Sequence, residues 1–187
     1  MIWPFVPTQF ELPHCPNETE TLYLLQYSTW GHHSLAYYRE QQLVEFTYGD
    51  WELFALNKRD AYTGIKNMLF PTMGALGRKT VPWKPGQAIC PQFVDCVDVV
   101  PFPAPAYRAQ SLLEELETAY IREQNQELLN EDEGVYFVPY HEPYSVAYNC
   151  NHALAKWLEQ LGGRISGRVF YHPDFIAGMS PRLTSVP

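Results

Sequence analysis

The stretch "YNCNHALAKWLEQLGG" (Tyr148–Gly163) decides how this chain is interpreted, because it places a cysteine at the start of an amphipathic helix. Asn149 is a strong N-cap residue, so we expect Cys150 at the first helical position, and the two glycines at the end supply a stop. The helical period predicts that Cys150 points inward and that His152 points toward solvent. The residues that share the inward face with Cys150 are Ala153, Leu154, Trp157, Leu158 and Leu161.

An inward cysteine at a helix N-terminus has two interpretations. One is a small buried hydrophobic residue, since free cysteine is among the most buried residue types. The other is a thiolate stabilised by the helix dipole and by unpaired backbone N–H groups, which can lower a cysteine pKa to roughly 3.5–7.5. Position alone does not choose between them, so a histidine from elsewhere in the chain is needed.

The segment "HHSLAYY" (32–38) supplies two candidate histidines at the start of a predicted strand. Neighbouring strand residues point to opposite faces, so only one of His32 and His33 can face the cysteine. The remaining histidines have weaker claims because they lie in or beside proline-containing segments; they are His14, His141 and His172.

Length and composition indicate one domain over 1–187, with an irregular arm at 1–20, a core at about 21–175 and a tail at 176–187. The net charge of −8 argues against nucleic-acid binding, which depends on clustered basic residues. The N-terminus "MIWPFVPTQF" contains two prolines and no basic residue, so we expect neither a signal peptide nor a membrane span. We therefore expect a cytoplasmic location. Four cysteines are too few for a disulfide scaffold, so reduced thiols are expected as well.

The pattern of elements predicts an α+β protein. Three strands joined by short turns, at 21–27, 33–38 and 43–51, predict an antiparallel sheet. The remaining expected elements are a helix at 52–70 with a break near Gly64, a loop at 71–86, one or two strands within 87–102, a helix at 111–130 capped by Ser111, and a strand at 135–140.

Two of these segments resemble a known family. "NCNHALAKWL" is similar to the "NCEHF"-type nucleophile segment of the lecithin retinol acyltransferase-like proteins, and "HHSLAYY" is similar to their "HWALY"-type strand, which carries the base. That family belongs to the circularly permuted branch of the papain-like, NlpC-type superfamily, where the base strand precedes the nucleophile helix. The order of His33 and Cys150 matches that branch. A run of "HSL", "EFTYGDW" and "FPT" also resembles an uncharacterised bacterial group of this type, which extends the likeness over about 22–75 and 135–162.

The resemblance implies a small antiparallel sheet packed against the cysteine-bearing helix and further helices. It also implies a thiol-dependent hydrolase or acyltransferase acting on an amide, ester or thioester carbonyl. In the family a polar residue twelve positions after the base orients its imidazole, and this position is Glu45 when His33 is the base. Taking His32 as the base would give Val44, which cannot orient a ring, so His33 is favoured.

The turn "REQQ" lacks the glycines that the family uses there, so the register between the two strands is open. A one-residue slip would bring Asp50 toward His33 in place of Glu45. Tyr27, at the end of the first strand, is a candidate hydrogen-bond donor to an oxyanion. The family's lipid-acting members often carry a membrane anchor, and we expect none here, so retinoid or phospholipid chemistry is not implied.

Two other motifs give weaker evidence of a functional site. "GALGRKT" (Gly74–Thr80) lacks the glycine spacing of a phosphate-binding loop, and Cys90 and Cys96 are too far apart for the usual zinc motif. We therefore expect no metal or cofactor, and a small-molecule, peptide or acyl substrate. The second function class is a catalytically silent papain-like module that uses its cleft for recognition, since fold alone does not guarantee activity.

Overall fold

The computed structural model describes residues 9–11, 18–28, 32–58, 60, 63, 66–67 and 70–166. Its main feature is an antiparallel sheet with the strand order β6-β2-β3-β4-β5-β8-β7. The strands are β2 (Thr19–Tyr27), β3 (His33–Arg39), β4 (Gln42–Asp50), β5 (Thr72–Pro82), β6 (Cys96–Pro105), β7 (Leu128–Asn130) and β8 (Val135–Tyr144). A second, two-stranded sheet pairs β1 (Gln9–Glu11) with β9 (Arg164–Ser166).

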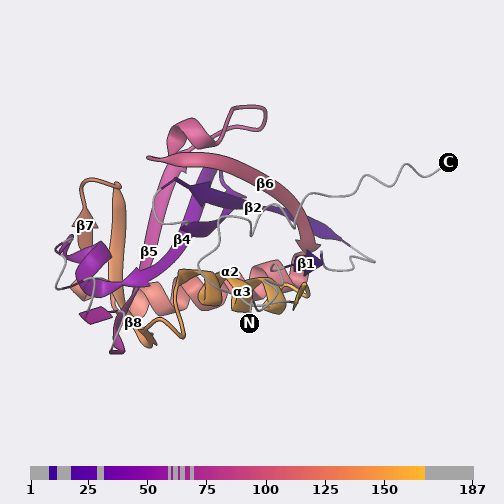
Figure 1. Cartoon of the computed structure of the whole chain (residues 1–187). Helices are drawn as coiled ribbons and strands as arrows, with labels where there is room; N and C mark the ends of the chain where they lie inside the picture. Colours follow the sequence, from indigo (N-terminus) through magenta and orange to yellow (C-terminus); the bar gives the residue numbers. More distant parts are fainter. Residues whose placement is uncertain are drawn as a thin grey trace.

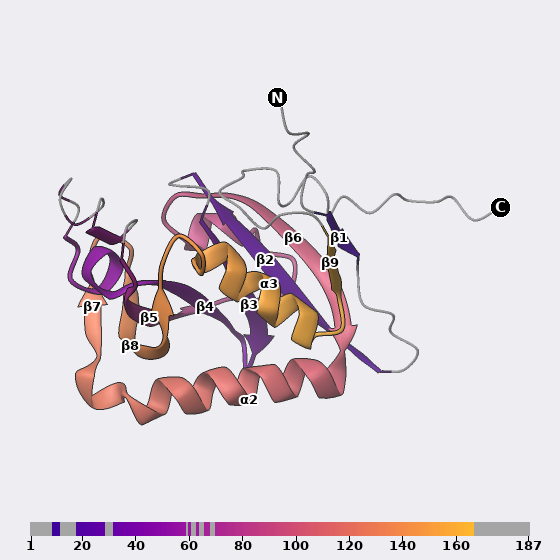
Figure 2. The ribbon, with the colours of Figure 1, turned by 60° about the horizontal axis from the view of Figure 1, so that its bottom comes forward.

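The two long helices, α2 (Ala106–Arg122) and α3 (Cys150–Gln160), lie on the same side of the sheet (Figures 1 and 2). They bury their apolar stripes against it in one large cluster, which includes Leu116, Leu154 and Trp157. Short helical turns complete the described elements: η1 (Trp51–Ala55), η2 (Cys90–Gln92) and η3 (Gln124–Gln126). The predicted α+β class is therefore confirmed. Within the described residues, no helix combines the length and apolar character needed to cross a bilayer.

Strand β4 has both faces buried and divides the core into two parts. Val44, Phe46 and Tyr48 face α2 and α3, whereas Leu43 packs on the opposite side beneath Trp83 and Phe93. We call this second side the outer face. In Figure 1 the segment between β5 and β6 lies over it, on the far side of the sheet from the two helices. Period-two alternation therefore sends successive β4 side chains into two different environments.

The turn between β3 and β4 fixes which residues share a face. Glu40 and Gln41 both have positive φ, at 50° and 64°, so they form a two-residue turn of the kind that glycine and asparagine usually supply. This turn pairs Arg39 with Gln42 and Ala36 with Glu45. Glu45 therefore shares the outer face with Ala36, on the other side of the sheet from Leu35 and its partner Phe46.

The predicted strands at 21–27, 33–38 and 43–51 are confirmed, but the expected loop at 71–86 is wrong, because Thr72–Pro82 is the long strand β5. Its glycines indicate close strand packing: a Cβ on Gly74 would lie 2.1 Å from the carbonyl oxygen of Glu142, and one on Gly77 would lie 2.5 Å from the Phe137 ring. At these two positions glycine allows the neighbouring strand β8 to approach closely, and it does not mark a loop.

Other boundaries also differ. Helix α2 begins at Ala106, with Ser111 inside it, and ends at Arg122, so part of the expected 111–130 helix becomes η3 and β7. Of the expected helix at 52–70, the structure describes the π-helical turn η1 and only scattered residues beyond it. The arm at 1–20, expected to be irregular, contains β1 and the start of β2. His14, Cys15, His172 and the 176–187 tail lie outside the described residues.

The expectation of reduced thiols is wrong for Cys90 and Cys96, which form a disulfide. The bond closes the short segment that contains η2 and ties it to the start of β6. Disulfides persist mainly in oxidising compartments. The disulfide therefore does not support the expected cytoplasmic location.

Candidate functional site

The N-terminus of α3 is built as its sequence predicts. Asn149 is the N-cap, and its Oδ1 accepts hydrogen bonds from the backbone N–H groups of Asn151, at 3.1 Å, and His152, at 3.4 Å. The backbone N–H of Asn149 in turn donates to Nδ1 of His152, at 3.4 Å. His152 is therefore part of the helix cap, and Cys150 occupies the first helical position.

His33, the first residue of β3, contacts this end of the helix although it lies far from it in the sequence. Its Nδ1 lies 3.0 Å from Oδ1 of Asn151, and both side chains are buried. The Cys150 thiol lies 3.9 Å from the same oxygen and donates to it. One amide oxygen is thus shared by the thiol and the imidazole, and Asn151 connects the two predicted site residues.

The environment of Cys150 keeps its thiol neutral. Burial raises the pKa of Cys150 to about 11, while the backbone N–H groups of Asn151, Cys150 and His33 act in the opposite direction. The helix N-terminus therefore stabilises a thiolate here, as the sequence suggests, but desolvation has the larger effect. In the resting protein Cys150 is a protonated, partly buried thiol.

Glu45 does not lie beside His33, and its predicted role as the orienting residue is wrong. The β3–β4 register places Glu45 on the outer face, where its Oε1 accepts hydrogen bonds from Tyr27 and Ser34. The twelve-residue spacing from His33 would suit a hairpin with a different turn, but the two-residue turn puts an odd offset between them. Asn151 is the side chain that holds the imidazole.

The two further candidates are also held elsewhere. Tyr27 donates to Glu45 on the outer face, so it is not positioned to contact an oxyanion on Cys150. Asp50 is fully buried, accepts a hydrogen bond from the backbone N–H of Leu53 at 2.8 Å, and accepts another from the Thr72 hydroxyl. It caps η1 and fastens it to β5.

The sequence pattern did not single out Asn151 or Tyr48 as site residues. Tyr48 lies on the helix side of β4 and donates to the carbonyl of Glu142, at 3.0 Å. Burial raises its pKa, with smaller contributions from Glu142, Tyr140, Asp50 and Cys150. Only the position of Asn151, one residue after the cysteine and in the first turn of a helix, could have indicated its role.

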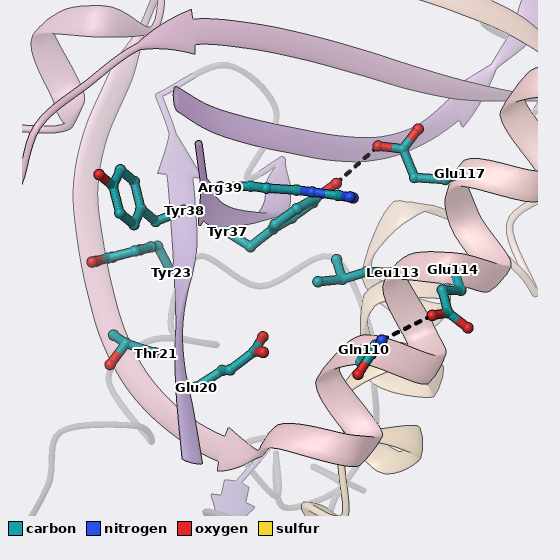
Figure 3. A pocket seen from close by; sticks show the side chains of 10 residues that line it. All are labelled: Glu20, Thr21, Tyr23, Tyr37, Tyr38, Arg39, Gln110, Leu113, Glu114 and Glu117. Atoms are coloured by element: carbon teal, nitrogen blue, oxygen red, sulfur yellow. Dashed lines mark hydrogen bonds between the residues drawn. The ribbon is translucent and has the colours of Figure 1, made fainter. Parts of the chain in front are cut away.

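A wide groove between α2 and the sheet is a separate feature (Figure 3). Its volume is about 740 Å³, and it carries Glu20, Glu114 and Glu117 together with Arg39. Tyr37, the buried polar residue among those that line it, already donates to Glu117, at 2.9 Å, and Arg78 pairs with the same carboxylate. Neither Cys150 nor His33 lines this groove.

No protein-family model, curated protein or solved structure matches this chain. In the part of the chain that the structure describes, no three His, Cys, Asp or Glu side chains gather closely enough to hold a metal ion.

Proposed function

We propose that Cys150 and His33 form a thiol-dependent acyl-transfer site, and that the protein is a cysteine hydrolase or acyltransferase acting on an amide, ester or thioester carbonyl. The observation that carries the proposal is the shared Asn151 oxygen, which connects a buried histidine to a thiol at a helix N-terminus. The same contact supports a permuted papain-like fold, because the histidine strand precedes the cysteine helix in the chain and packs against its first turn.

The proposed reaction starts from a neutral thiol. The sulfur attacks the carbonyl carbon while the thiol proton passes to the imidazole of His33, so attack and proton transfer occur together. The N–H groups at the start of α3 stabilise the oxyanion. The bond to the leaving amine, alcohol or thiol then breaks, and the imidazolium protonates that group. Water, or the acceptor of a transferase, then attacks the thioester carbonyl while His33 takes its proton. The C–S bond breaks, the acyl product leaves, and the imidazolium returns the proton to the Cys150 sulfur.

Asn151 replaces Glu45 in this scheme as the residue that positions the base. An amide oxygen that accepts from Nδ1 fixes the ring plane without adding a charge. An Nδ1 that donates to this oxygen already carries a proton, so to receive the thiol proton the ring must first take the tautomer protonated on Nε2, and the Asn151 amide must turn away. Substrate binding between the thiol and the ring would supply that displacement.

A second candidate is the silent binding module, and one observation favours it. A cysteine pKa near 11 is the opposite of what a preformed thiolate nucleophile requires. In this case the neutral thiol, Asn151 and His33 are a buried polar group that fixes α3 against β3.

The experiment that separates the two is trapping of an acyl-enzyme. The protein is mixed with p-nitrophenyl acetate or an acetyl thioester, quenched in acid, and digested for mass spectrometry. We expect an acetyl group on the peptide that contains Cys150, formed at least 100-fold more slowly in His33→Ala, since a positioned base contributes about 10²–10⁴-fold.

The matched control is His141→Ala, which removes an exposed histidine outside the site and should leave the rate unchanged. Cys150→Ser should abolish the thioester. Acetylation that is equally fast in His33→Ala, or no acyl group on Cys150 with any donor, would support the silent module instead.

A further inference from the structure

The outer face of the sheet contains a second polar site, independent of the proposed function. It is a cavity of about 60 Å³ whose polar lining includes Tyr27, His32, Glu45 and Thr47, and whose apolar walls include Phe54 and Phe93. Convergent polar groups in a mostly apolar cavity are the usual sign of a ligand site.

Glu45 is the central group of this cavity. Its side chain is only 2% exposed, and its Oε1 accepts from the hydroxyls of Tyr27 and Ser34. Its Oε2, which is also buried, has no hydrogen-bond partner among the described residues. A buried carboxylate oxygen without a partner is costly, and a ligand or water that donates to it removes that cost.

His32 is the second incompletely satisfied group. Its Nε2 is hydrogen-bonded to the Thr47 hydroxyl, while its Nδ1 has no partner within the described part of the chain. Burial lowers the pKa of His32 to about 3, so the ring is neutral at physiological pH and adds no positive charge to the cavity.

The charges around the cavity favour a cation. Three acidic residues line it, Glu45, Asp95 and Glu133, against one basic residue, Lys79. The protein already places an ammonium group in these surroundings: Lys79 Nζ donates to the carbonyl of Glu133 at 2.9 Å and lies 5.4 Å from the centre of the Phe93 ring. Aromatic faces and carboxylates together are typical of ammonium recognition.

We propose that this cavity binds a small primary ammonium ion, whose nitrogen donates to Oε2 of Glu45 and whose short alkyl group lies against Phe54 and Phe93. The volume sets the size of the ligand: one water needs roughly 10–15 Å³, so the space accepts only a few non-hydrogen atoms. The disulfide between Cys90 and Cys96 encloses Phe93 and Asp95 and so holds one wall of the cavity in place.

The experiment is an NMR titration of the ¹⁵N-labelled protein with ethylammonium chloride against sodium chloride at matched ionic strength. We expect saturable shifts of amides around Glu45 and Thr47, with a dissociation constant of about 1 mM or weaker, as suits a ligand of three non-hydrogen atoms. Acetate and ethanol, which match ethylammonium in size but lack its charge, should bind at least tenfold more weakly.

Three variants test the assignment. Glu45→Gln should weaken ethylammonium binding at least tenfold, and Lys79→Met should strengthen it, because a repelling ammonium is removed. Glu114→Gln, which removes a carboxylate from the groove beside α2, should leave ethylammonium binding unchanged. Val94→Trp narrows the cavity from an exposed position and should weaken binding even if Glu45→Gln does not fold.

Shifts that sodium chloride reproduces, or acetate binding that equals ethylammonium binding, would overturn the proposal. Weaker ethylammonium binding in Lys79→Met would overturn it too, because it would show that the Lys79 ammonium does not compete with the ligand for this cavity. Undiminished binding in both Glu45→Gln and Val94→Trp would place the ligand elsewhere.

Discussion

Two opposing effects meet at Cys150, and their balance can be measured. Burial raises the pKa of the thiol to about 11, and the N–H groups at the start of α3 only partly counter it. Below that pKa the thiolate fraction grows tenfold per pH unit, so the rate of alkylation of Cys150 by iodoacetamide should keep rising from pH 6.5 to about 10. The rate is followed by mass spectrometry on the peptide that contains Cys150. A plateau below pH 8 would show an activated thiolate instead.

A substitution at Asn151 tests its contact with His33 directly. Asn151→Asp would place a carboxylate 3.0 Å from Nδ1 of His33, and an opposite charge at that distance favours the imidazolium. The pKa of His33 should therefore rise by about 1 or more, as measured from the pH titration of its ring protons by NMR. Asn125→Asp, at an exposed position on η3, is the matched control. An unchanged His33 titration would mean that Asn151 does not contact the ring in solution.

Among the elements, the β3–β4 hairpin decides which predicted site residues meet. Its turn uses Glu40 and Gln41 in left-handed conformations that cost non-glycine residues about 1–2 kcal/mol each. Glu40→Asn with Gln41→Gly should raise the free energy of unfolding by about 1 kcal/mol, after the entropy of the new glycine is counted. Urea denaturation measures this change. A loss of stability would mean that the register relies on the native side chains.

The same hairpin explains which parts of the fold and the site could be predicted from the sequence. Strands β2, β3 and β4 and helix α3 were predictable because alternation and capping are local signals. The face on which Glu45 lies relative to His33 was not, because it depends on whether the turn has two residues or another number, and "REQQ" carries no glycine to indicate the turn type. Strand β5 was missed for a related reason: its glycines serve the neighbouring strand β8, which only the folded sheet brings close.

Considered as a whole, the molecule separates its polar groups by the sheet. The thiol, Asn151 and His33 lie on the side of α2 and α3, while His32, Glu45 and Tyr27 lie on the outer face. The adjacent residues His32, just before β3, and His33, at its start, thereby belong to two different sites. A substitution at His32 should accordingly leave the proposed acyl-transfer site intact, which allows its effect on folding to be measured alone.

The outer face should also make stability depend on pH. The pKa of His32 is about 3 in the folded protein and about 6.5 in the unfolded chain. The contribution of the neutral ring to the unfolding free energy is therefore fully present above pH 6.5 and is lost as pH falls toward 3. Glu45 acts in the opposite sense: burial raises its pKa, so its contribution is present below about 4.5 and is lost as pH rises through the folded value.

His32→Gln isolates the first of these effects. Relative to this variant, the wild type should lose about 2 kcal/mol of unfolding free energy between pH 6.5 and 4.5, because a full difference of one bound proton is worth about 1.4 kcal/mol per pH unit. Urea denaturation at three pH values across this range measures the difference, and His141→Gln, at an exposed position, is the control. A wild type and a His32→Gln variant whose stabilities fall in parallel would show that His32 is protonated in the folded protein as readily as in the unfolded chain, and that the outer face is open to water.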